Sequence, residues 1–144
     1  MNPDARGRLE QLLDRELEVA RSLELTLAAE KSALTGESAA AVERLAAEKV
    51  RLFDLLESME KERRALGHAP AADAPPAAGL ADRWRALMDL MAGCRAANEV
   101  NGHIIHARLN QIRQLLGVVR GVQPLTYGPQ GKTLATALRA LARA

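Results

Sequence analysis

The hydrophobic positions between residues 80 and 119 recur in alternating steps of four and three residues. This spacing puts all of them on one stripe of a helix, and it predicts a single helix of about 40 residues, roughly 60 Å long. The stripe consists of Leu80, Trp84, Leu87, Met91, Cys94, Asn98, Asn101, Ile105, Arg108, Ile112, Leu115 and Val119. A helix of this length favours a rod-like bundle, which offers grooves for other helices and little room for an enclosed pocket. Binding is therefore expected before catalysis.

Two earlier segments carry stripes of the same kind. A seven-residue repeat of Leu and Ala predicts a first helix over about residues 3–34, and steps of three and four predict a second over about 38–66. The break between them, Thr35-Gly36-Glu37, is so short that the two helices must form an antiparallel hairpin. Residues 67–79 contain three prolines and no periodicity, and they are interpreted as a linker.

The pattern changes again after residue 120. Residues 121–131 contain Pro124, Gly128 and Pro129 and have no periodicity. Apolar residues then recur at Leu134, Leu138 and Leu141, which predicts an amphipathic helix too short to be stable alone. The predicted fold is all-α: an elongated antiparallel bundle of three long helices in residues 1–120, followed by a flexible tail, residues 121–144, with a short C-terminal amphipathic helix.

Composition supports this fold class and narrows the choice of partners. Only 2% of the residues are aromatic, and 48% are hydrophobic, mostly Ala and Leu. No acidic residue follows Glu99, so the C-terminal third is basic and could favour an acidic partner, an anionic membrane or nucleic acid. Its six basic residues are widely spaced and accompanied by one aromatic residue, Tyr127, which is too little for a nucleic-acid surface. We expect no nucleic-acid partner.

The expected location is the cytoplasm. No leader segment opens the chain, and no run of 18 apolar residues occurs, so stable membrane insertion is not expected. Cys94 is the only cysteine, which excludes an intrachain disulfide and suits a reducing compartment. Because Cys94 belongs to the apolar stripe, we predict that it is buried.

Polar residues interrupt the stripe at Asn98 and Asn101, directly before Gly102. Asparagine on a helix seam costs stability and tends to fix register or to mark where a polar partner docks. Glycine inside a helix costs roughly 1 kcal/mol relative to alanine, unless a neighbouring backbone must come close. These three residues are predicted to set register and close packing or to recognise a partner. On this basis, replacing both asparagines with leucine should raise thermal stability.

Two basic residues, Lys49 and Arg63, occupy seam positions of the second predicted helix. We interpret them as surface residues whose aliphatic stems cover the edge of the core.

Two constellations invite a chemical interpretation, and neither is convincing. Residues 128–133 resemble part of a phosphate-binding loop, but the first glycine of that motif is missing and Pro129 removes a backbone N–H. His103 and His106, with Glu99 one turn earlier, could offer two metal ligands, but a third ligand is not evident. No spacing typical of nucleophilic catalysis occurs. We expect no enzyme, no cofactor and no metal.

The motifs of the C-terminal half resemble those of a known family. Asn98-x-x-Asn101-Gly102, then Ile104-Ile105, Leu115-Leu116-Gly117 and finally Tyr127-Gly128-x-x-Gly131, are similar to the FlgN family of flagellar export chaperones. The chain length, the helical hairpin, the linker and the amphipathic tail also match, so the resemblance extends over nearly the whole chain. The motifs that distinguish this family from other helical proteins lie in residues 98–131.

The resemblance implies a cytoplasmic, non-enzymatic type III secretion chaperone. Such a protein binds the C-terminal helical segments of the hook–filament junction proteins FlgK and FlgL, prevents their premature assembly and delivers them to the export gate. The family's C-terminal region is implicated in both contacts. The resemblance assigns the gate contact to Tyr127.

Physical reasoning adds a mechanism. A bundle with one loosely held helix can exchange it for an amphipathic helix of the client, and the marginal tail helix is the natural piece to exchange. The predicted client-binding residues are Ile112, Leu116, Val119, Leu134, Leu138 and Leu141.

Two alternatives stay open on the residues alone. One is a coiled-coil scaffold whose stripes serve self-association in a homo-oligomer. The other is a nucleic-acid-binding regulator that uses the basic C-terminal third, with an affinity that falls steeply as salt rises.

Overall fold

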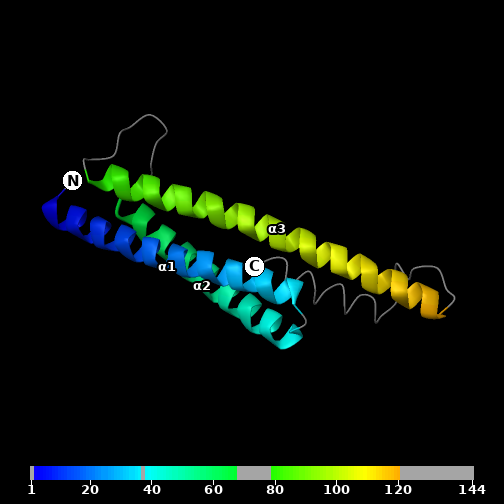
Figure 1. The fold of residues 1–144 in the computed structure, drawn as a ribbon. Coiled ribbons are helices and arrows are strands. Elements are labelled where there is room, and N and C mark those ends of the chain that lie inside the picture. The colour runs from blue at the N-terminus through cyan, green and yellow to red at the C-terminus, as the bar shows by residue number, and fades with distance from the viewer. Residues whose placement is uncertain (1, 37, 68–78, 121–144) are drawn as a thin grey trace.

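The computed structural model describes residues 2–36, 38–67 and 79–120, which form three helices (Figure 1). They are α1 (Pro3–Thr35), α2 (Ala39–Ala65) and α3 (Leu80–Arg120). The prediction of an all-α fold with three helices packed antiparallel is confirmed, and each observed helix end lies at or next to its expected position. The tail and its short helix lie outside the described residues, so the division into a bundle and a tail stays a prediction.

Local signals fix where the helices begin and turn. Asn2 Oδ1 accepts a hydrogen bond from the Asp4 N–H at 3.2 Å, and Pro3 occupies the first turn of α1. The hydroxyl of Ser38 accepts from the Ala41 N–H at 3.2 Å and caps α2 in the same way. Because only three residues separate α1 from α2, the second helix folds straight back along the first.

The central element of the bundle is α1. Both α2 and α3 pack along it, whereas α2 and α3 approach one another closely at very few points. Because α2 brings the chain back to the starting end of α1, α3 begins there and runs parallel to α1 and antiparallel to α2 (Figure 1). Leu9 and Leu80 share a cluster at one end, and Leu34 and Ile105 share another near the hairpin turn.

The core consists of three apolar clusters along α1, and α3 contributes to each of them. The middle cluster contains Leu23, Leu27, Leu52 and Cys94, and it draws residues from all three helices. Cys94 is buried, as predicted, with its sulfur 3.7 Å from the Ala20 carbonyl oxygen. Burial raises the pKa of this thiol, which keeps it protonated and unreactive.

A buried polar layer lies between the middle cluster and the one near the turn. The Nζ of Lys49, from α2, lies 3.0 Å from both carboxylate oxygens of Glu30 and donates to Asn98 Oδ1 at 3.0 Å. The amide of Asn101 donates to Glu30 Oε1 at 2.8 Å and to the Leu27 carbonyl oxygen at 3.0 Å. One carboxylate of α1 therefore joins α2 and α3 at the same height.

A second polar layer lies nearer the other end. The Nε of Arg63 donates to the two carboxylate oxygens of Glu16 at 3.3 and 3.2 Å, and its guanidinium stacks 4.5 Å from the ring centre of Trp84. Desolvation raises the pKa of Glu16, while the charge of Arg63 opposes that rise. In each helix the two layers are fourteen residues apart (Glu16 and Glu30, Lys49 and Arg63, Trp84 and Asn98), which corresponds to about 21 Å.

Two sequence-based interpretations are wrong. Lys49 and Arg63 are not surface residues that cover the core edge, because both are buried and form ion pairs between helices. Their buried partners, Glu30 and Glu16 of α1, explain why these two basic residues are inside the bundle, and the periodicity of α2 alone does not reveal such partners. Close packing is also not the reason for Gly102, because a Cβ added there would meet nothing within 4 Å.

The polar layers generate a prediction about ion-pair energetics. Replacing Lys49 with methionine leaves the buried charge of Glu30 uncompensated, so the free energy of unfolding should fall by about 3–5 kcal/mol. Adding Glu30→Leu to the same chain should recover most of that loss, because no buried charge is left. Urea unfolding measures both. The control is Lys61→Met, which removes an exposed pair with Glu57 and should cost less than about 1 kcal/mol. Equal losses for Lys49→Met and the control would contradict the prediction.

The hydrogen bonds of the asparagines reverse the stability change expected from the sequence. Asn101 is fully buried, and leucine in its place would remove the amide that donates to Glu30 Oε1 and to the Leu27 carbonyl oxygen. We predict that Asn101→Leu lowers the free energy of unfolding by about 1–3 kcal/mol, and that Asn98→Leu, at a half-buried position, lowers it less. Thermal melting followed by circular dichroism tests this. A higher melting temperature for Asn101→Leu would restore the sequence-based expectation.

Candidate functional site

The C-terminal end of α3 projects beyond the rest of the bundle (Figure 1). Arg108 donates from its guanidinium to the Gly36 carbonyl oxygen at 2.9 Å, which places Arg108 level with the hairpin turn. Leu109 is still buried, and residues 110–120, called here the overhang, continue past the turn. At 1.5 Å per residue the overhang is about 16 Å long.

The overhang carries exposed apolar side chains in one short stretch. Leu115 and Val118 are 65% and 81% exposed, and Ile112 and Leu116 are about 40% exposed. The stripe that α3 buries against α1 up to Arg108 continues here through Ile112 and Leu115, where the hairpin has already ended. A cluster of large exposed apolar residues on one helix is typical of an interaction surface.

The structure describes only part of the client-binding set predicted from the sequence. Ile112 and Leu116 lie on the overhang. Val119 belongs to α3, but its side chain is outside the description, and so are Leu134, Leu138, Leu141 and Tyr127. The sequence-based set omitted Leu115 and Val118, which are the most exposed apolar residues among the side chains that the structure describes on the overhang. Leu115 was on the predicted stripe, and that stripe was the sequence signal that could have identified it, although only the structure shows that it lies past the hairpin turn.

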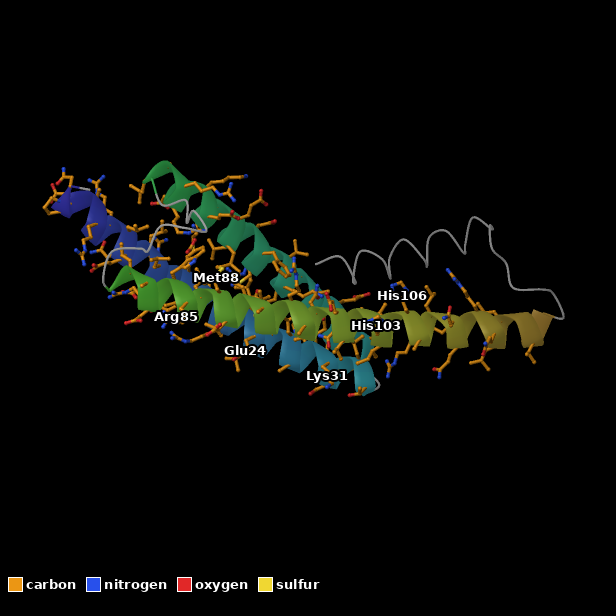
Figure 2. The ribbon with its side chains drawn as sticks, turned by 90° about the horizontal axis from the view of Figure 1, so that it is seen from above. Glu24, Lys31, Arg85, Met88, His103 and His106 are labelled. Carbon is orange, nitrogen blue, oxygen red and sulfur yellow. The ribbon has the colours of Figure 1, made fainter. Side chains whose placement is uncertain are left out.

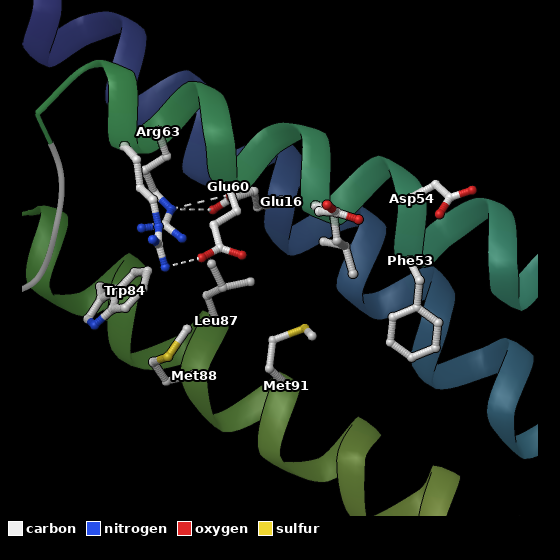
Figure 3. Close-up of a pocket in the computed structure, with 12 residues that line it drawn as sticks. Glu16, Phe53, Asp54, Glu60, Arg63, Trp84, Leu87, Met88 and Met91 are labelled. Atoms are coloured by element: carbon white, nitrogen blue, oxygen red, sulfur yellow. Dashed lines mark hydrogen bonds and ion pairs between the residues drawn. The ribbon is translucent and has the colours of Figure 1, made fainter. Parts of the chain in front are cut away.

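A second feature is a groove between α2 and α3, with α1 beneath it (Figure 3). Its volume is about 730 Å³. The α3 wall is apolar, the α2 wall also carries charged side chains, and Glu16 of α1 lines the floor. The apolar lining consists of Phe53, Leu56, Trp84, Leu87, Met88 and Met91, and the charged residues of the α2 wall are Asp54, Glu57, Glu60, Arg63 and Arg64.

The groove lies between the two polar layers. Arg63 stacks on Trp84 at one end of it, and Lys49 reaches Asn98 beyond its other end, which Phe53 and Met91 line. Between these bridges α2 and α3 stand apart, and Glu16 of α1 lines the space between them. The sequence did not predict the groove. The packing of α2 and α3 on α1 decides which of their faces stay apart, and the sequence alone does not show this packing.

Asn98, Asn101 and Gly102 lie on α3 between the groove and the overhang, and they do not form an open site. Asn101 is enclosed in the polar layer, and Asn98 is half-buried in the same layer, beyond the end of the groove. Gly102 is half-buried. Their assignment to register or partner recognition stays a prediction.

The chemical constellations weighed from the sequence gain no support. Glu99, His103 and His106 are all exposed on α3 (Figure 2 labels the two histidines). Within the described residues, no three His, Cys, Asp or Glu side chains gather where they could hold a metal ion. Residues 128–133, the loop compared with a phosphate-binding motif, lie outside the description.

No helix in the described ranges is both long enough and apolar enough to cross a bilayer.

A slender helical bundle with an apolar overhang and an open groove between helices is the architecture of a protein that binds other helices. Comparison with known proteins gives the family: the model of the FlgN protein family matches residues 1–135. The chain therefore belongs to the FlgN family, the non-enzymatic export chaperones of flagellar hook-associated proteins. No curated protein and no solved structure matches the chain.

Proposed function

We propose that this protein binds the C-terminal helical segments of FlgK- and FlgL-like hook–filament junction proteins, prevents their premature assembly in the cytoplasm and delivers them to the export gate. The observation that carries the proposal is the overhang, a helix end whose apolar side chains extend past the hairpin. Family membership gives the class of client, and the overhang gives a surface on which a client helix can pack.

The spacing on the overhang suits an amphipathic helix. Positions 112, 115, 116 and 119 follow the i, i+3, i+4, i+7 pattern with which one helix anchors on another. A client segment that assembles through amphipathic helices exposes such a face when it is free, so packing against the overhang covers both apolar surfaces at once. In this proposal Ile112, Leu116 and Val119 contact the client together with Leu115.

The tail extends the same surface in sequence. Leu134, Leu138 and Leu141 repeat the helical spacing after residues 121–131, and the helix they predict is too short to be stable alone. We propose that this segment adds to the client contact once a client helix is present to pack against. The proposal requires neither a nucleotide nor a metal.

The overhang proposal predicts the effect of a buried charge at the interface. Leu115→Asp should weaken client binding at least 10-fold, because the carboxylate would lose its hydration against an apolar helix. Calorimetric titration with a recombinant FlgK-like protein from the same genome measures the affinity. Leu25→Asp is the matched control, since Leu25 is 71% exposed on α1 and its substitution should change the affinity less than 2-fold.

Two outcomes would contradict the proposal. One is wild-type protein that does not bind the junction protein. The other is Leu115→Asp protein that binds it at full affinity while its helicity is unchanged. A scaffold that only self-associates gives a third pattern: Leu115→Asp dissociates an oligomer, and junction proteins are never bound.

A second prediction concerns Tyr127, the only aromatic residue after Trp84. It lies between Pro124 and the Gly128-Pro129 pair, where a regular helical stripe cannot bury it. Aromatic anchors often dominate interfaces, and the family resemblance assigns this one to the export gate. Tyr127→Ala should keep the fold and client binding but weaken gate binding about 10-fold, or about 1.4 kcal/mol.

Titration of the client-loaded protein against the purified cytoplasmic domain of the gate protein measures this effect. Thr126→Ala, the neighbouring position, is the control and should bind the gate normally. Unchanged gate affinity for Tyr127→Ala would remove the tyrosine from the gate contact.

A further inference from the structure

The three helices occupy three corners of a four-helix arrangement. In such a bundle each helix packs along two neighbours, and helices on opposite corners stay apart. Here α1 packs along both α2 and α3, while α2 and α3 have few close approaches. The missing fourth helix would lie opposite α1, between α2 and α3, and the 730 Å³ groove is at that position.

The lining of the groove suits a helix better than a small molecule. A small-molecule site needs a few polar groups that converge on the ligand. The polar side chains deepest in this groove, Glu16 and Arg63, are already engaged with one another. The apolar lining residues come from two helices, and on α2 the lining runs from Phe53 to Arg64, a length of about 16 Å or three helical turns.

Methionine side chains make the α3 wall of the groove adaptable in shape. Met88 is 38% exposed, and Met91 is half-buried beside it on the α3 wall (Figure 3). Methionine is unbranched and polarizable, so a surface that contains it adapts to side chains of different shape. A groove of this kind can accept more than one helix sequence.

Charge on the α2 wall defines the partner further. Asp54 is exposed and, within the described residues, forms no ion pair. Glu57 and Glu60 pair with Lys61 and Arg64 one turn further on, but these exposed pairs are weak and easily exchanged. The three carboxylates follow one edge of the groove at spacings of three residues.

We propose that the groove binds an amphipathic helix of the client as the fourth helix of the bundle. The helix presents large apolar residues at i, i+3 or i+4 and i+7 to the groove, and Lys or Arg on the flank that faces α2. This inference rests on the proposed function, and it adds a second client surface, separate from the overhang, with a stated chemical preference.

The chain's own tail is a poor occupant, on grounds of length. Met91, at the near end of the groove, lies 29 residues before Arg120 on α3, a distance of about 43 Å. Thirteen residues, 121–133, precede Leu134, the first residue of the apolar stripe of the tail, and they span about 43–47 Å when fully extended. The tail would reach only the near end of the groove, and only with its connecting segment fully stretched.

The position of Trp84, the only tryptophan of the chain, provides a direct test. Full-length protein labelled with 5-fluorotryptophan gives one ¹⁹F resonance, from the wall of the groove, whatever tryptophans the client contains. Titration with the unlabelled recombinant FlgK-like protein should shift this resonance until it saturates. Calorimetry on the same samples gives the total affinity.

Three substitutions show where the client binds. Met88→Asp places a charge on the apolar wall and should weaken binding at least 10-fold. Val100→Asp is the matched control, at a position on α3 that is 44% exposed and does not line the groove, and its effect should stay below 2-fold. Asp54→Lys should weaken binding several-fold at low salt and less at high salt, because it reverses a charge on the edge of the groove.

The possible failures are distinguishable. If calorimetry detects binding that Leu115→Asp removes, but the Trp84 resonance does not move, the groove is not a client site and the proposed function stands. If no binding is detected at all, the proposed function fails. A resonance that moves with protein concentration alone identifies a second copy as the occupant. A resonance that moves in Leu138→Asp without client identifies the tail. Either of the last two results overturns the inference.

Discussion

The buried carboxylate of Glu30 is the constraint on which the arrangement of this bundle depends. It lies in the interior of α1, where an unpaired charge would be too costly to keep, so the fold must supply partners for it. Lys49 from α2 and Asn101 from α3 both reach it, at distances of 3.0 and 2.8 Å. A shift of either helix by one turn would break these contacts, whereas leucine stripes tolerate such a shift at a lower cost. The polar layer therefore fixes the register of both outer helices against α1.

That register decides the two surfaces proposed for binding. Because α3 starts level with the first turns of α1 and is longer, its last residues must pass the hairpin turn and form the overhang. Because the two polar layers hold α2 and α3 on separate sides of α1, the space between the outer helices stays open as the groove. The two buried ion pairs thus set the helix register that leaves the apolar side chains of the overhang and the groove exposed.

The two surfaces differ in what they offer a partner. The overhang is a single helix with exposed Leu115 and Val118, and the residues after Glu99 include no acid. The groove is concave, contains methionine and carries carboxylates along α2. A client with two amphipathic segments of different charge would engage both surfaces of an export chaperone at once, and linking two weak contacts raises the overall affinity without any new contact. Such binding is compatible with release at the gate, since each contact can open separately.

The sequence by itself determined the fold class, the three helices with their ends, the burial of Cys94 and the family, because helix periodicity and capping are properties of neighbouring residues. It also placed Ile112 and Leu115 on one stripe. It misjudged Lys49 and Arg63, and it did not reveal the hydrogen bonds of Asn101, because the partners of these polar residues lie on another helix. The overhang and the groove were decided by tertiary structure alone, since exposure depends on where a neighbouring helix ends and which helices it separates.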